Sequence, residues 1–161
     1  MNMKKVMNKS WLSAFMICMS LILSSCLETG LDDLESYDDA EIRAFKFEHR
    51  WEQTMSGGNN TQLGVVSLPT DVKIEGNTIS CTITVPEAGN PSFFTEEVRD
   101  GVKLEKIVGI ATISTASTIH PMDGAPVLGK WGDFSKSCKY KVIAADGKTT
   151  EEWIIQCRLV K

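Results

Sequence analysis

A loop rich in glycine and proline carries the residues best suited to hold a ligand. Residues 121–134 carry Trp131, a large aromatic side chain, between flexible neighbours. An indole face suits the apolar face of a sugar ring, while Asp123, Lys130 and Asp133 can hydrogen-bond its hydroxyl groups. Loops of this kind often carry binding residues on a rigid scaffold. The alternative is that Trp131 folds back to cap the domain, which the usual burial of large aromatic side chains favours.

Trp51 is a second candidate of the same kind. It follows His49 and Arg50 and precedes the polar run at residues 56–60, Ser-Gly-Gly-Asn-Asn. Because Gly and Asn are typical of loops, Trp51 is expected near the end of its element. Its indole therefore has the same two interpretations, a binding surface or part of the core.

Motifs of catalysis and metal binding are absent from the sequence. It has no Gly-x-Ser-x-Gly elbow and no His-Glu-x-x-His pair, and residues 146–149 lack the upstream glycine of a phosphate-binding loop. Asp123 and Asp133 would be oxygen ligands for Ca²⁺, but without the spacing of an EF-hand. His49 and His120 have no close cluster of ligand residues around them. We predict a protein that is not an enzyme and has no metal or cofactor, since we expect no glycosidase carboxylate pair in so small a domain.

Short alternating runs must position these residues. From Ile42 the apolar residues mostly follow a period of two, and Gly, Pro, Asn and Asp separate the runs. A Gly-Asn turn predicts a hairpin with Ile74 opposite Ile79. About seven or eight such strands predict an all-β fold, a single Ig-like antiparallel β-sandwich over residues 42–161. An up-and-down barrel is the alternative.

Three cysteines, Cys81, Cys138 and Cys157, fall on the predicted inward faces of these strands. This placement favours buried free thiols. A disulfide between Cys138 and Cys157 is the alternative in an oxidising envelope, and it depends on the last turn. A turn at Asp146–Gly147 places Cys138 opposite Ile155, whereas a turn one residue later places the two cysteines opposite each other. The number of free thiols distinguishes the two.

The N-terminal residues predict export and lipidation. Three lysines precede thirteen mostly apolar residues, Trp11–Leu23, the order of a signal peptide. Thirteen helical residues rise about 20 Å, short of the roughly 30 Å of a bilayer core. Residues 23–26, Leu-Ser-Ser-Cys, resemble the lipobox of bacterial lipoproteins, which implies a signal peptide at 1–25 and acyl chains such as palmitate on Cys26. Several chains anchor a protein stably in a membrane. A plain secreted protein, or an uncleaved anchor, is the alternative.

The acidic charge is concentrated between the lipidation site and the domain. Seven acidic residues and no lysine or arginine lie within 27–41, whereas residues 42–161 carry 14 of each sign. Such a run predicts that residues 26–41 are an extended tether. It resembles the acidic signal that directs lipoproteins of Bacteroidota to the outer face of the outer membrane, so we expect a surface-facing anchor there. A neutral domain with an acidic arm is not expected to bind nucleic acid.

The chain from about Ala40 to the C-terminus resembles a known family. Its motifs match the Ig-like domains of unknown function in surface lipoproteins of Bacteroides and related Bacteroidota. The matching segments are Ala40–Phe45, Thr118–Pro121, Asp133–Ser135 and Tyr140–Gly147. The resemblance implies an accessory or glycan-capture role beside polysaccharide uptake, and it carries no catalytic residue.

Two functions follow from these patterns. The first is a lipid-anchored, surface-exposed, non-catalytic binding or accessory module whose partners are the membrane, through Cys26, and polysaccharides or other surface proteins. Exposure of Trp131 and Trp51 would support it. The alternative is a structural or fimbrial assembly subunit, in which the sandwich lends or accepts a strand. An incomplete sheet edge would favour that alternative.

Overall fold

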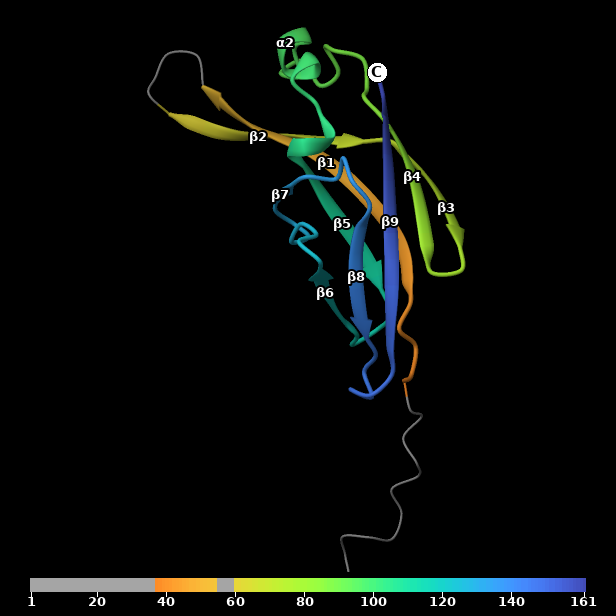
Figure 1. The fold of residues 1–161 in the computed structure, drawn as a ribbon. Coiled ribbons are helices and arrows are strands. Elements are labelled where there is room, and N and C mark those ends of the chain that lie inside the picture. Colours follow the sequence, from red (N-terminus) through yellow and green to blue (C-terminus); the bar gives the residue numbers. More distant parts are fainter. Residues whose placement is uncertain (1–36, 55–59) are drawn as a thin grey trace, which may run out of the picture. The chain divides into compact units, whose positions relative to one another are not determined.

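The computed structural model describes residues 37–54 and 60–161, which form two β-sheets packed face to face around one core (Figure 1). Each sheet combines strands that are consecutive in the sequence with strands that are distant in it. The first sheet has the order β2-β1-β5-β7, with β1 at Ile42–Thr54, β2 at Thr61–Leu68, β5 at Ile107–Ile113 and β7 at Trp131–Gly132. The second has the order β3-β4-β9-β8-β6, with β3 at Thr70–Glu75, β4 at Thr78–Thr84, β6 at Thr118–Met122, β8 at Cys138–Ile143 and β9 at Thr150–Val160.

The all-β sandwich predicted from the sequence is confirmed, with two differences. The described residues form nine strands rather than seven or eight, because the two-residue β7 is too short to give an alternating pattern. One pairing, between β4 and β9, is parallel. Periodicity shows which residues face inward but not which way a strand runs, so the antiparallel prediction fails at this pair. The two helical segments, α2 (Glu96–Asp100) and η1 (Leu104–Lys106), lack the length and apolar character to cross a membrane, as does every helix of the described part.

The predicted hairpin between β3 and β4 is confirmed in its register. Ile74 lies opposite Ile79 and Val72 lies opposite Cys81. The turn contains Gly76 with a φ of +56°, a left-handed conformation that glycine adopts without strain. Along β4, buried and more exposed residues alternate, as expected for a strand with one face on the core.

A cluster of aromatic rings lies in the core between the sheets. Phe47 and Phe134 have centroids 5.1 Å apart in an edge-to-face arrangement, and Phe45 lies 5.2 Å from Phe47. Gly109 on β5 makes room for them, since a Cβ there would lie 2.6 Å from Cζ of Phe134. Tyr140 on the facing sheet completes the cluster, 6.3 Å from Phe45.

Candidate functional site

Trp131 lies on β7, at the edge of the first sheet, and 47% of its surface is exposed. It lies opposite Val108 in the ladder between β5 and β7. Its Nε1–H donates a hydrogen bond of 3.2 Å to the backbone oxygen of Arg50, which fixes one edge of the indole. The ring is thus half-exposed on the outer face of the sheet, rather than fully buried as a cap of the domain would be.

A groove of about 530 Å³ opens beside this ring. Its lining is mainly apolar and comes from four strands and one loop: Arg50, Leu63, Val108, Gly129, Lys130 and Trp131. Strand alternation explains the set, because Arg50 lies between the inward-facing His49 and Trp51 and so points to the outer face. Leu63 and its neighbour Val65 on β2 are 52% and 39% exposed, so the apolar surface extends from the groove along β2.

The loop that forms one wall of the groove is held at several points. Gly129, with a φ of +80°, donates its N–H to the oxygen of Gly109 and accepts a 3.0 Å hydrogen bond from Nη1 of Arg50. Pro126 packs on Gly132, where a Cβ would lie only 2.1 Å from the proline ring, and its oxygen accepts the Tyr140 hydroxyl at 2.8 Å. These contacts make the groove a preformed feature of the fold.

Three cationic side chains, Lys106, Arg50 and Lys130, lie at or beside the groove. Nζ of Lys106 lies 5.5 Å from the centroid of the Trp131 ring, a cation–π distance. Arg50 forms a two-nitrogen ion pair with the Glu48 carboxylate, at 3.0 Å from Nε and 2.8 Å from Nη2. Lys130 lines the groove itself and is exposed.

Two predicted members of the site lie elsewhere. Asp123 pairs with Lys139 at 3.1 Å, and Asp133 accepts the backbone N–H of Ser135 at 2.8 Å. Hydrogen bonds from Ser135 lower the pKa of the Asp133 carboxyl. Neither aspartate lines the groove, so the structure brings together only Trp131 and Lys130 of the four loop candidates. In residues 37–54 and 60–161, no three His, Cys, Asp or Glu side chains form a metal-binding group.

The side chain of Trp51 packs against other aromatic rings of the domain. Its ring stacks on His49 with centroids 5.5 Å apart and 17° between planes, and it contacts Phe93 and Phe94. It also lies over Gly64, its partner across the ladder between β1 and β2. The indole is half-buried against the core, and it does not line the groove.

The three cysteines of the described residues, Cys81, Cys138 and Cys157, are free thiols. The last turn lies at Asp146, so Cys138 faces Ile155 and the disulfide to Cys157 is not formed. Cys157 instead lies opposite Cys81 on the parallel strand β4. A hydrogen bond between these two thiols lowers the pKa of Cys81 and raises that of Cys157.

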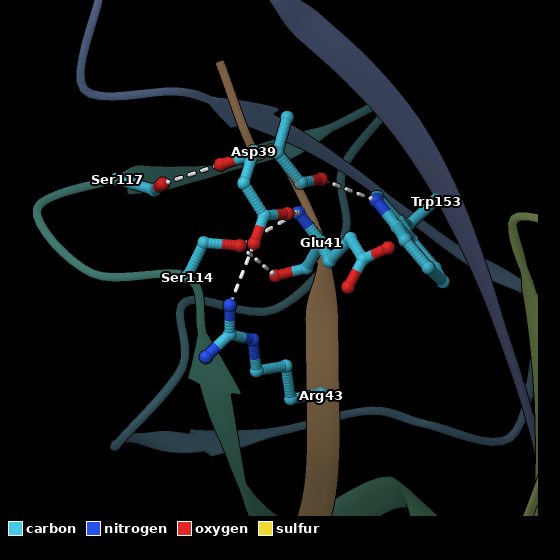
Figure 2. Close-up of polar contacts among 7 residues, drawn as sticks. Asp39, Glu41, Arg43, Ser114, Ser117 and Trp153 are labelled. Carbon is cyan, nitrogen blue, oxygen red and sulfur yellow. Dashed lines mark hydrogen bonds and ion pairs between the residues drawn. The ribbon is translucent and has the colours of Figure 1, made fainter. Parts of the chain in front are cut away.

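A second cleft, of about 770 Å³, lies where the described chain begins. We call the hydrogen-bonded group beside it the N-terminal clamp: Asp39, Ala40, Glu41, Arg43, Ser114, Ser117 and Trp153 (Figure 2). The Asp39 carboxylate accepts a hydrogen bond from the guanidinium of Arg43. Hydrogen bonds from Ser114 and Arg43 hold the pKa of this carboxyl below its usual range.

Residues 37–41 are predicted from their charge to be part of the tether. In the structure they belong to the compact unit that begins at Tyr37. Cys26 lies outside the described residues.

Sequence reasoning missed most of the groove. Leu63, Val108 and Gly129 have no special chemistry as residue types, and they meet only through the order of the strands in the sheet. One signal was present, since the run Leu63–Val66 interrupts the alternation expected of a strand with a polar outer face.

Similarity to known proteins covers most of the chain. Residues 42–156 match a family described as DUF5018-related. The fold is similar to that of a Bacteroides fragilis protein described as secreted, with a TM-score of 0.69 and 30% identity, covering 78% of this chain and 99% of that one. A Bacteroides thetaiotaomicron protein described as a glycoside hydrolase gives a TM-score of 0.45 and 18% identity, covering 82% of this chain and 28% of that one, which is too low to support an argument. No curated protein matches significantly.

Proposed function

The chain belongs to the DUF5018-related family, and from this premise we propose that it is a non-catalytic accessory module of the cell surface that binds carbohydrate at Trp131. The observation that carries the proposal is the half-exposed indole over a preformed groove. The ring is anchored through Nε1, and the groove beside it has the apolar floor that the C–H face of a sugar requires. Lys130 and the backbone of Gly129 supply polar groups at the wall.

The location rests on sequence and similarity together. The Bacteroides fragilis relative is described as secreted, which supports a position outside the cytoplasm. The lipobox-like residues before Cys26 and the acidic run after it support a lipid anchor in the outer membrane with the domain facing outward. The domain would then stand at the surface with its groove open to external polymers.

The lining of the groove supports a binding role rather than catalysis. Its six residues include no carboxylate, hydroxyl, thiol or imidazole that would act as an acid, base or nucleophile. Trp131 and Leu63 offer exposed apolar surface for contact, and the two cations offer hydrogen bonds.

Affinity electrophoresis of the full-length protein in a mild non-ionic detergent tests the proposal. The gels contain a panel of neutral and acidic polysaccharides, and mobility is compared with gels that lack polysaccharide. We expect at least one polysaccharide to retard the protein, and Trp131→Ala to weaken this binding about tenfold or more, since an aromatic anchor is typically worth about 2 kcal/mol.

The matched control is Tyr37→Ala, which removes another exposed aromatic side chain, one that does not line the groove. This variant should bind like the parent protein. Unretarded migration of the parent in every gel, or equal losses in both variants, would contradict the proposal.

One observation favours the assembly alternative. β7 pairs only with Ile107 and Val108, so the rest of that edge of β5 has no strand partner within the described residues. An open edge of this kind can accept a strand from another chain. Concentration-dependent polymers in light scattering of the full-length protein would support assembly, and a monomer at all concentrations would count against it.

A further inference from the structure

Two lysines beside the groove carry charge that no described residue neutralises. Lys130 lines the groove, and Lys106 holds its Nζ 5.5 Å from the centre of the Trp131 ring. Both residues are exposed, and neither forms an ion pair with an acid of the described chain. Positive charge is therefore available at the position where a bound sugar would contact the indole.

The acidic residues near the groove do not cancel this charge. The Glu48 carboxylate is held by the guanidinium of Arg50. Asp133, two residues after Trp131, directs its carboxylate to the backbone N–H of Ser135. Glu52 lies opposite Leu63 in the ladder but does not line the groove. The two lysines thus remain free to meet an anionic ligand.

We propose that the groove binds an acidic polysaccharide, one whose rings carry carboxylate or sulfate groups. This inference rests on the proposed carbohydrate-binding function and names its ligand class. The exposed apolar side chains of Leu63 and Trp131 contact the face of a ring, while Lys106 and Lys130 receive its anionic substituents. Lysine suits this task, because its ammonium group donates in three directions from a flexible stem and accommodates charges at varied positions along a polymer.

Matched pairs of polysaccharides distinguish the contribution of the anionic groups to binding from that of the sugar rings. The full-length protein is run through gels containing polygalacturonate, alginate, hyaluronan or chondroitin sulfate, each beside its carboxyl-reduced form and, for the last, its desulfated form. The variants are Lys130→Gln and Lys106→Gln, with Lys148→Gln as a control, because Lys148 is equally exposed but lies in the turn between β8 and β9. The mobility of each protein is divided by its mobility in a gel without polysaccharide. This ratio corrects for the change in net charge that the substitution causes.

The inference expects binding to an acidic polymer that is lost when its charges are removed. Lys130→Gln and Lys106→Gln should each weaken binding about two- to fivefold, as for exposed charge pairs, while Lys148→Gln leaves it unchanged. Raising the salt to about 0.5 M should weaken it further, because exposed charges are screened. Equal binding to charged and neutralised forms would overturn the inference and leave the carbohydrate function standing. Free migration in every gel would overturn both.

Discussion

Gly64 and Trp51 form a cross-strand pair in which the missing side chain of one makes room for the ring of the other. A Cβ at Gly64 would lie 2.4 Å from Cε2 of Trp51 and 2.6 Å from Cζ2. Because the ring is also held by His49 and Phe94, it cannot move away without loss of packing. We expect Gly64→Ala to lower the free energy of unfolding by about 1–3 kcal/mol, measured by urea denaturation.

The same substitution in a Trp51→Leu background distinguishes the cause. With the indole gone, Gly64→Ala should cost much less, so that the two effects are not additive. An undiminished cost in the double variant would assign the effect to the backbone of β2 rather than to the ring.

His49 makes stability depend on pH. It is 5% exposed, and its Nδ1 has no hydrogen-bond partner within the described residues. Burial, and then the positive charge of Lys106 and Lys161, lowers its pKa below 6.5. The unfolded chain therefore takes up a proton at a higher pH than the folded one, and the free energy of unfolding falls as the pH drops below about 6.5, levelling off once the folded pKa is passed. The midpoint of thermal unfolding, followed from pH 7.5 to 5, measures this.

His49→Phe keeps a ring against Trp51 and removes the titrating group. Between pH 7.5 and 5 the variant should lose less stability than the parent, because the carboxyl groups titrate mainly at lower pH. Parallel curves for the two proteins would show that His49 does not cause the slope.

At the scale of elements, the turn between β5 and β6 forms hydrogen bonds with the residues that precede β1. Ser114 is buried, accepts the N–H of Glu41 at 3.0 Å and donates to its oxygen at 3.3 Å. We expect Ser114→Ala to destabilise the domain by about 0.5–1.5 kcal/mol, the net contribution of a hydrogen bond, since Glu41 keeps its bonds to the Asp39 carboxylate and to the backbone N–H of residue 114. It should also raise the pKa of Asp39 toward its usual value, because Ser114 is the largest cause of the lowered pKa. Carboxyl NMR titration and urea denaturation measure the two effects.

Ser117 provides the matched control within the same turn. Its hydroxyl makes one hydrogen bond, 3.0 Å, to the backbone oxygen of Asp39 and none to the carboxylate. Ser117→Ala should therefore leave the pKa of Asp39 unchanged. An equal pKa change in both variants would mean that movement of the whole turn, rather than the Ser114 hydroxyl, sets the titration.

Sequence patterns predict elements here better than they predict their assembly. The β3–β4 hairpin, including Ile74 opposite Ile79, follows from alternation and a Gly-Asn turn, both of which are local. The parallel pairing of β4 with β9 joins segments about seventy residues apart, and no local signal encodes it. The same limit applies to the groove. The residue types of Trp131 and Lys130 mark them as candidate binding residues in the sequence. The rest of the groove lining cannot be predicted in this way, because only the strand order brings Leu63 and Val108 beside them.

At the scale of the whole molecule, the lipid anchor is a prediction with a direct test. Cys26→Ala removes the proposed acylation site, so the protein should leave the membrane fraction and lose labelling by a palmitate analogue in cells. Cys157→Ala, a cysteine of the folded domain, should change neither property. Labelling that persists in Cys26→Ala would place the lipid elsewhere or show that the chain is held in another way.

The course of β1 determines how the molecule would respond to force. The strand begins beside the N-terminal clamp and carries the groove residue Arg50. Figure 1 shows β5 and β2 beside it, and the ladders place β5 along its first part and β2 along its last. Its hydrogen bonds to both neighbours run across the strand. Tension between a membrane anchor and a polymer held in the groove would therefore act along β1 and load many of these bonds at once, in shear. With the proposed anchor and ligand in place, a domain joined in this way would resist being pulled apart under such tension.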